Sequence, residues 1–337
     1  MVRSQWLGRG MRAEDQPPRR LALAVALFAL CVHAGAASAQ VGALPDNAGL
    51  NTLDTLRDGV EIGEARCRAL HPAIWLSVEG RRFCVRYWLS TGGGPGDEAI
   101  VFMHGDVGGR QGGRYYVAGG AAHVTAERQR QRAERRSRML GATYIAVGRP
   151  GAYGSSGHHL RQRRTLLEVN VMTAALDAIK ARHGIGRFHL VGQSGGGHTV
   201  ASLLALRTDL GCAVMTSGIL SVRSHARDLG WPITAKIAAS HDPIEIVGDI
   251  RNRPGLRMVV ISDPDDRQVP YRSQREFVER VRTRGLHVLH VMASGGGGAS
   301  HELAAVGLRL AADCARGADD DTLSRTYRTK APPPGGG

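Results

Sequence analysis

The sequence predicts an α/β fold in which a mostly parallel sheet is flanked by helices. Apolar runs of strand length alternate with longer stretches of helical spacing from about residue 99 onwards. Several of the short runs contain no polar position, which is typical of strands covered on both faces. The 337 residues and 42% hydrophobic content suffice for one large domain of this kind.

The predicted elements follow one another in a regular order. Residues 75–78 and 83–89 alternate apolar and polar side chains around Glu79-Gly80-Arg81-Arg82, which predicts a hairpin. A glycine-rich turn then leads into the fully apolar run 99–103. Further strands are predicted at 143–147, 188–191, 213–215, 257–261 and 286–291, and helices at 125–140, 166–183, 195–206, 273–284 and 301–315.

Three segments depart from this alternation. Residues 219–254 separate two predicted strands with little periodicity, and connections of that length often cover a functional site. We therefore expect a short lid there, inside a domain that spans residues 75–316. Residues 40–74 are expected to form an extended N-terminal segment, and residues 317–337, which end in Pro-Pro-Pro-Gly-Gly-Gly, a disordered tail.

The N-terminus has the three parts of an export signal. A basic stretch ending in Arg19-Arg20 precedes an apolar run over 21–32, and Ala37-Ser38-Ala39 supplies a small-x-small cleavage site. This pattern predicts a signal peptide over residues 1–39, cleavage after Ala39, and a periplasmic or secreted protein with no stable membrane span. The apolar run is short for a bilayer-spanning helix. An uncleaved anchor is the alternative.

Four cysteines remain after the predicted cleavage: Cys67, Cys84, Cys212 and Cys314. An even number in an oxidising compartment predicts two disulfides, with three possible connectivities. Cys67 with Cys84 closes the shortest loop and is favoured, which would leave Cys212 to pair with Cys314. Four buried free thiols are the alternative. The cysteine spacings do not suit a metal site, so we expect neither a metal nor a cofactor.

The formal net charge of +14 raises the question of nucleic-acid binding. The densest basic stretch, residues 127–138, has the spacing of a solvated helix face. It has no nucleic-acid-binding motif, and aromatic residues make up only 5% of the chain. Basic charge by itself supports only nonspecific association. We therefore expect no specific nucleic-acid partner.

The motif that points to chemistry is Gly192-Gln193-Ser194-Gly195-Gly196, which matches G-x-S-x-G. A strand is predicted directly before it and a helix directly after it. A turn this tight holds the serine in strained geometry and requires small neighbours. The hydroxyl of Ser194 is therefore expected to project above the sheet as a nucleophile.

A nucleophilic serine needs a base, and the base needs an acid to orient it. In the chain order expected after such a turn, the acid comes first and the histidine last. Asp263, Asp265 and Asp266 follow the predicted strand 257–261, and His301 follows the strand 286–291. Both loops lie at the carboxyl ends of strands, where open α/β sheets build their sites.

With these motifs, residues 75–315 resemble the α/β-hydrolase family, in its esterase or prolyl-oligopeptidase-like branches. The family's D-x-x-V-P stretch selects Asp266 as the acid, with Asp265 the nearer rival and Asp263 the other. The matching histidine is His301. One oxyanion donor is expected to be the N–H of Gly195.

The second oxyanion donor is expected in His104-Gly105-Asp106, which resembles the family's H-G-x loop and would supply the backbone N–H of Asp106. Two other polar residues near these loops have two possible roles each. Arg149 is interpreted as either an anchor for a substrate carboxylate or half of a structural ion pair. His198 lies one helical turn past Ser194 and either lines a pocket or packs within the helix.

The resemblance implies an exported serine hydrolase that cleaves a carboxylic ester through an acyl-enzyme on Ser194. A compact serine peptidase similar to the prolyl-oligopeptidase branch is one alternative, and a binding protein on a catalytically dead scaffold is another. Pocket shape rather than the triad separates these activities. The expected partner is a small ester or a short peptide, and the sequence leaves the acyl group and the oligomeric state open.

Overall fold

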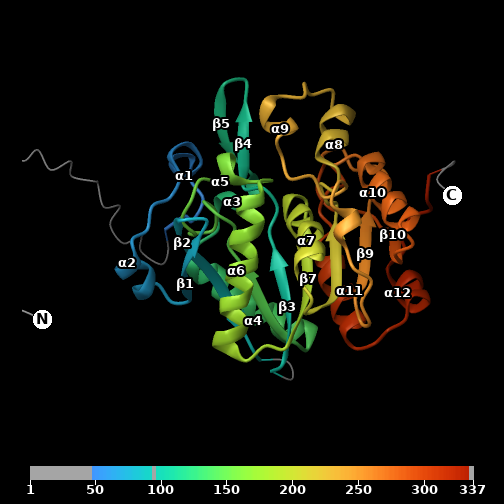
Figure 1. Cartoon of the computed structure of the whole chain (residues 1–337), viewed down its shortest axis with the longest axis horizontal. Helices are drawn as coiled ribbons and strands as arrows, with labels where there is room; N and C mark the ends of the chain where they lie inside the picture. The colour runs from blue at the N-terminus through green and yellow to red at the C-terminus, as the bar shows by residue number, and fades with distance from the viewer. Residues whose placement is uncertain (1–47, 93–95, 334–337) are drawn as a thin grey trace, which may run out of the picture. The chain divides into compact units, whose positions relative to one another are not determined.

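A sheet of eight strands in the order β1-β2-β6-β3-β7-β8-β9-β10 runs through the protein (Figure 1). This computed structural model describes residues 48–92 and 96–333, so the predicted signal peptide lies outside the described residues. The strands are β1 Ala73–Val78, β2 Arg81–Ser90, β3 Glu98–Met103, β6 Thr143–Val147, β7 Arg187–Gln193, β8 Leu210–Thr216, β9 Arg257–Ser262 and β10 Val288–Met292.

Six neighbouring strands, from β6 to β10 in that order, pair in parallel. β2 pairs antiparallel with both β6 and β1, and a short turn at Glu79-Gly80 joins β1 to β2 as a hairpin. Parallel neighbours need helical crossovers, which place helices on both faces of the sheet. The predicted α/β fold class with a mostly parallel sheet is therefore confirmed.

Two sets of helices cover the two faces of the sheet. Helices α6, α7 and α10 pack on one face, and α4, α11 and α12 on the other. Neighbouring residues of β3 show the division, since Val101 belongs to the first hydrophobic core and Ile100 to the second. The helices span α4 Ala126–Leu140, α6 Leu166–His183, α7 Gly195–Leu206, α10 Tyr271–Thr283, α11 Ala304–Ala315 and α12 Asp320–Tyr327.

Several short elements gather at one end of the sheet. The hairpin of β4 (Gly108–Gln111) and β5 (Arg114–Val117) projects there, and α8 (Val222–Asp228) and α9 (Ala235–Ala238) of the segment predicted as a lid lie at the same end (Figure 1). Within this segment, 219–254, the Asp242 carboxylate accepts hydrogen bonds from the N–H groups of Val222 and Arg223 and so joins residue 242 to the start of α8.

Two expectations about irregular segments are wrong. Part of the predicted extended segment forms two short helices, α1 Leu53–Asp58 and α2 Glu64–Ala69, of which α1 has a capping box at Thr52. Part of the predicted disordered tail forms α12, whose N-cap is Asp319 and whose Leu323 and Tyr327 are buried against the second core. These two apolar contacts stabilise a segment that its charged composition disfavours.

Two disulfides join the four cysteines in the favoured pairing, Cys67 with Cys84 and Cys212 with Cys314. The first ties α2 to β2, and the second ties β8 to α11. Across residues 48–92 and 96–333, the helices are too short or too polar to cross a bilayer. The same part of the chain contains no cluster of three or more potential metal-ligating side chains.

Candidate active site

Ser194 lies in the turn between β7 and α7 with φ 57° and ψ −118°. A non-glycine residue in this region is strained and persists only where its surroundings impose the conformation. Close packing imposes it here, because a β-carbon on Gly196 would lie 2.0 Å from the carbonyl oxygen of Met103. The N–H of Ser194 also donates to the carbonyl of Thr216 at 2.9 Å.

His301 and Asp266 are in direct contact. Nδ1 of His301 lies 2.8 Å from Oδ2 and 3.1 Å from Oδ1 of Asp266. The carboxylate is fully buried, and its Oδ1 also accepts the N–H groups of Gln268 and Val269. An ionised carboxylate can only accept, so Nδ1 of His301 carries the proton and Nε2 is left as the basic nitrogen.

The two rival carboxylates are engaged elsewhere. Asp263 accepts the N–H of Gly295 at 2.7 Å and the ammonium of Lys330. Asp265 is 74% exposed and also pairs with Lys330. Among the described residues, neither of them contacts His301. Lys330, which follows α12, thus pairs with the two rivals, while Asp266 contacts the histidine.

Gln193 joins the serine turn to the histidine loop. Its Nε2 donates to the carbonyl of His301 at 2.7 Å, and its Oε1 accepts from the hydroxyl of Thr216 and the N–H of Leu303. In residues 48–92 and 96–333, no hydrogen bond links Ser194 Oγ to the His301 ring, and such contacts often tighten only when substrate binds. Sequence reasoning missed Gln193, because the motif leaves its position unspecified.

The His104-Gly105-Asp106 loop lies against the turn that carries Ser194. A β-carbon built on Gly105 would sit 3.8 Å from Oγ of Ser194. Within the described part of the chain, no protein acceptor takes the N–H of Asp106 or that of Gly195. Both predicted oxyanion donors are thus free of protein partners, on two segments that pack against each other.

His104 fixes the position of this loop. Its Nδ1 donates to the carbonyl of Gly105 at 2.7 Å, and its Nε2 accepts the N–H of Arg149 at 3.0 Å. Burial, together with the nearby Arg149 guanidinium, holds the pKa of His104 well below its ordinary value. The neutral ring is therefore a structural link between the loops that follow β3 and β6.

The side chain of Asp106 is surrounded by cations. Its Oδ1 accepts from Arg149 at 3.1 Å, and its Oδ2 accepts from Arg163 at 3.0 Å and from Arg164. Burial alone would raise the pKa of Asp106, but Arg164, Arg163, the His159 ring and Arg149, in that order, outweigh it and hold the pKa well below its ordinary value. The carboxylate is therefore ionised.

Arg149 is completely buried and is paired within the protein. Its Nε donates to Glu168 at 2.9 Å, and its Nη1 donates to Asp106 and to the carbonyl of His104. Although burial alone would lower it, these carboxylates raise the pKa of Arg149 above its ordinary value. Of its two possible roles, the structure supports the ion pair.

Two buried histidines flank the site. Burial lowers the pKa of His198 to about 4, and its Nε2 lies 2.6 Å from the carbonyl of His241, so it packs within the fold. His225 of α8 has its pKa lowered to about 4, chiefly by burial and then by Arg164. His225 also lies within electrostatic range of Asp106, Asp266 and His301, so α8 lies near the site.

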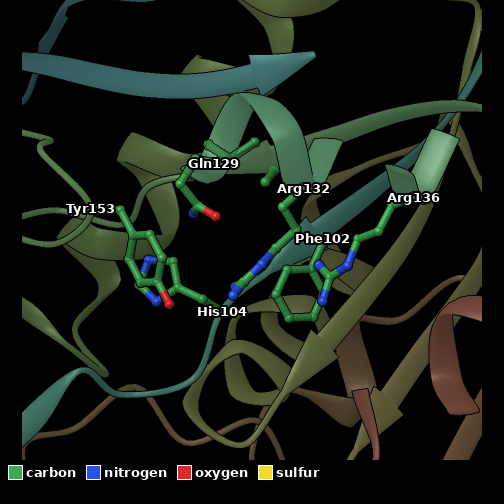
Figure 2. Close-up of a pocket in the computed structure, with 8 residues that line it drawn as sticks. Phe102, His104, Gln129, Arg132, Arg136 and Tyr153 are labelled. Carbon is green, nitrogen blue, oxygen red and sulfur yellow. The ribbon is translucent and has the colours of Figure 1, made fainter. Parts of the chain in front are cut away.

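A small cavity lies next to His104 and is lined by His104, Tyr153, Phe102 and three side chains of α4, Gln129, Arg132 and Arg136 (Figure 2). The rings of His104 and Tyr153 pack with centroids 4.0 Å apart. The cavity has room for about one water molecule. None of Ser194, Asp266 and His301 lines it, so it is a packing feature rather than a substrate pocket.

No protein-family model and no curated protein matches this chain. An acylaminoacyl peptidase from Pyrococcus horikoshii aligns with a TM-score of 0.49 and 14% identity over 74% of this chain, which spans 43% of that peptidase. The esterase Pf2001 of Pyrococcus furiosus aligns at 0.47 and 14% identity, over 69% of this chain and 87% of its own.

Est1E from Butyrivibrio proteoclasticus, solved with ferulic acid bound, aligns with a TM-score of 0.47 and 14% identity, over 65% of this chain and 89% of its own. The activities of these proteins are not transferred to this one by similarity at this level. The fold follows from the chain's own geometry. A mostly parallel sheet, flanked by helices and carrying a serine at a strained strand-to-helix turn, is the α/β-hydrolase fold.

Proposed function

We propose that this protein is an exported serine hydrolase that cleaves a carboxylic ester through an acyl-enzyme on Ser194. The observation that carries the proposal is the contact of His301 with buried Asp266, on loops at the same edge of the sheet as the strained Ser194 turn. Strained backbone persists where the surrounding structure imposes it, and such strain is concentrated at functional sites. A dead scaffold would have no need to keep this combination.

In the proposed mechanism, Nε2 of His301 removes the proton of Ser194 as Oγ attacks the ester carbonyl. Asp266 stabilises the imidazolium that forms and holds the ring in the reactive tautomer. The negative charge that develops on the carbonyl oxygen is bound by the N–H groups of Gly195 and Asp106. His301 then protonates the leaving alkoxide.

The second half of the cycle uses the same groups. His301 removes a proton from water, the hydroxide attacks the acyl-enzyme carbonyl, and Ser194 leaves with the proton returned by His301. The carboxylate of Asp106 would repel the oxyanion if it were unpaired. The three guanidinium groups bound to it offset that repulsion, which permits an acidic side chain at this position.

Export is proposed from two independent features. The residues before Ala39 have the sequence of a cleavable signal peptide, although they lie outside the described residues. Two disulfides tie distant elements together, and such bonds persist in oxidising compartments. The periplasm or the exterior of the cell fits both.

The first experiment compares Ser194→Ala and His301→Ala with the wild type on short-chain p-nitrophenyl esters. Both variants should lose turnover by several orders of magnitude and keep the wild-type circular dichroism spectrum. Labelling by a fluorophosphonate probe should disappear in both. Unchanged turnover in Ser194→Ala would contradict the proposal. Release of amino-terminal residues from peptides at rates that rival ester cleavage would favour a peptidase.

A further inference from the structure

A group of cationic side chains lies beside the proposed oxyanion donors and exceeds what the local carboxylates neutralise. Arg163 and Arg164, which follow α5 (His159–Gln162), share one oxygen of Asp106. Lys236, from α9 of the segment 219–254, lies close enough to interact with both arginines. We call these three side chains the cationic cluster.

The described carboxylates facing this cluster are already in use. Arg149 donates hydrogen bonds to Glu168 and to Oδ1 of Asp106. Among these carboxylate oxygens, Oδ2 of Asp106 is then left to serve the three cations of the cluster. Arg149 and the cationic cluster therefore bring four positive charges to two carboxylates, those of Asp106 and Glu168. Partly buried charge without a counter-charge costs free energy, and one arginine would be sufficient to hold Asp106 in place.

The cluster has access to solvent and to the site of reaction. The side chains of Arg163 and Arg164 are 22% and 17% exposed, whereas Arg149 is fully buried. Their common partner, Asp106, has its Oδ1 2.3 Å from the position of a β-carbon on Gly195, directly after the nucleophile. Arg164, Asp266 and His301 all act electrostatically on His225, so the cluster lies within electrostatic range of the same histidine as the proposed acid and base.

Unused donors remain on the cluster. Within residues 48–92 and 96–333, no acceptor contacts Nη2 of Arg163 or Nη1 of Arg164. The ammonium of Lys236 donates to the carbonyl of Leu160. Burial, then Arg163 and Arg164, lower the pKa of Lys236 to about 8, with Asp106 and Glu168 opposing this, so the ammonium is charged at neutral pH.

We propose that the cationic cluster of Arg163, Arg164 and Lys236 binds a carboxylate of the substrate next to the scissile ester. This inference rests on the proposed function and specifies its substrate class as esters that carry a second, anionic group. Guanidinium and ammonium donors suit a carboxylate, and charge-assisted hydrogen bonds are the strong ones. A bound carboxylate would supply the counter-charge that the protein lacks there.

The test uses matched pairs of esters that differ only in charge. Monomethyl esters of malonic to adipic acid are compared with the methyl esters of the corresponding monoamides, which have nearly the same shape. In these diacid esters the second carboxylate is on the acyl group. O-acetyl hydroxy acids and their amides test instead for recognition of a carboxylate on the leaving alcohol. Methanol or acetate release gives kcat/KM for each member. At neutral pH the wild type should prefer the acid by about tenfold or more in at least one pair.

Two variants connect the preference to the cluster. Lys236→Gln and Arg163→Gln should each lower the acid-to-amide ratio of kcat/KM by about tenfold. Arg161→Gln removes a positive charge two residues before Arg163, in α5 and outside the cluster, and should leave the ratio unchanged. Because Lys236 and Arg163 lie on different elements, a local folding defect in one variant would not explain the same loss in both.

The outcomes separate this inference from the proposed function. A ratio near one for every pair, with cleavage that depends on Ser194, would overturn the carboxylate subsite and leave the hydrolase intact. An equal loss for acid and amide in the two cluster variants would also overturn it, because the cations would then act on the oxyanion alone. Absence of ester cleavage by the wild type would contradict the function itself.

Discussion

Oδ1 of Asp106 occupies the space next to the α-carbon of Gly195, where a β-carbon would lie only 2.3 Å away. The Nη1 atom of Arg149 would be 2.9 Å from the same β-carbon. Both atoms belong to a buried ion-pair network, so neither can move aside at low cost. The contact fixes the distance between the two segments that carry the proposed oxyanion donors.

Replacing Gly195 with alanine should therefore damage catalysis more than folding. The methyl group would push the Asp106 loop away from the turn and misplace both N–H groups. Loss of one such donor lowers kcat by about 100-fold to 1,000-fold in other enzymes. Steady-state assays on a short p-nitrophenyl ester measure the effect. Gly119→Ala is the control, because a β-carbon there meets open space.

Asp266→Asn should lower kcat by about 10,000-fold, because the amide cannot stabilise the imidazolium or hold the productive tautomer of His301. Asp265→Asn is the matched control at the neighbouring position and should change kcat less than threefold, since Asp265 is mostly exposed. Single-turnover kinetics of the three proteins give the ranking. A larger loss in Asp265→Asn would assign the acid role to that residue.

Gln193→Leu tests the link between the two halves of the site. The substitution removes the donor to the His301 carbonyl and the acceptor for Leu303. Because both ends of the Gln193 amide are bonded to protein groups and hold the His301 loop, kcat should fall by about tenfold while KM stays nearly constant. Gln131→Leu, on the exposed face of α4, is the control. A rise in KM with unchanged kcat would show that Gln193 shapes the pocket instead.

The major elements could be predicted because each has strong local signals. Helix α6 begins after the capping residue Thr165 and ends at Gly184 in the left-handed conformation, and its bounds are those predicted. The hairpin of β4 and β5 was missed, although its turn, Gly112-Gly113, has positive φ at both positions and is a recognised hairpin signal.

The charge network around Asp106 could not be predicted. Arg163 and Arg164 lie 57 and 58 residues from their carboxylate along the chain, and their contact exists only after α5 and the β3 loop are brought together. No local pattern encodes such a pairing. The choice of Asp266 among three aspartates, by contrast, came from a short motif of the family that the sequence resembles, and the structure brings Asp266 into contact with His301.

Acidification should destabilise the protein through its buried histidines. His198 has a pKa of about 4 in the folded state, against an ordinary value near 6.5. Unfolding therefore takes up a proton between these values, so the stabilisation is complete above pH 6.5 and is lost as the pH falls towards 4. For His198 alone this corresponds to about 3 kcal/mol.

Urea unfolding at pH 7, 6, 5 and 4 measures this dependence. His198→Gln keeps a nitrogen donor for the His241 carbonyl but cannot titrate. Its free energy of unfolding should depend less steeply on pH than that of the wild type. Between pH 6 and 4 the variant should take up about one proton fewer on unfolding. His225, with a pKa also about 4, still titrates in the variant and accounts for part of the remaining slope. Parallel curves for the two proteins would contradict the assignment.

The two disulfides should differ in what they contribute to stability. Cys212–Cys314 spans 102 residues and Cys67–Cys84 spans 17. In the chain-entropy model, the longer loop loses more freedom in the unfolded state, so its bond should contribute about 4 to 5 kcal/mol and the shorter one about 3 kcal/mol. Paired Cys→Ala variants, unfolded in urea without reductant, measure each contribution.

The same bonds connect stability to the compartment. Cys31 precedes the predicted cleavage site, so the exported chain should contain no free thiol, and thiol titration of the denatured protein should give zero. Protein made in a reducing cytoplasm without residues 1–39 should titrate with four thiols and unfold at a lower urea concentration. If the oxidised and reduced forms were equally stable, the disulfides would no longer support the proposal of export.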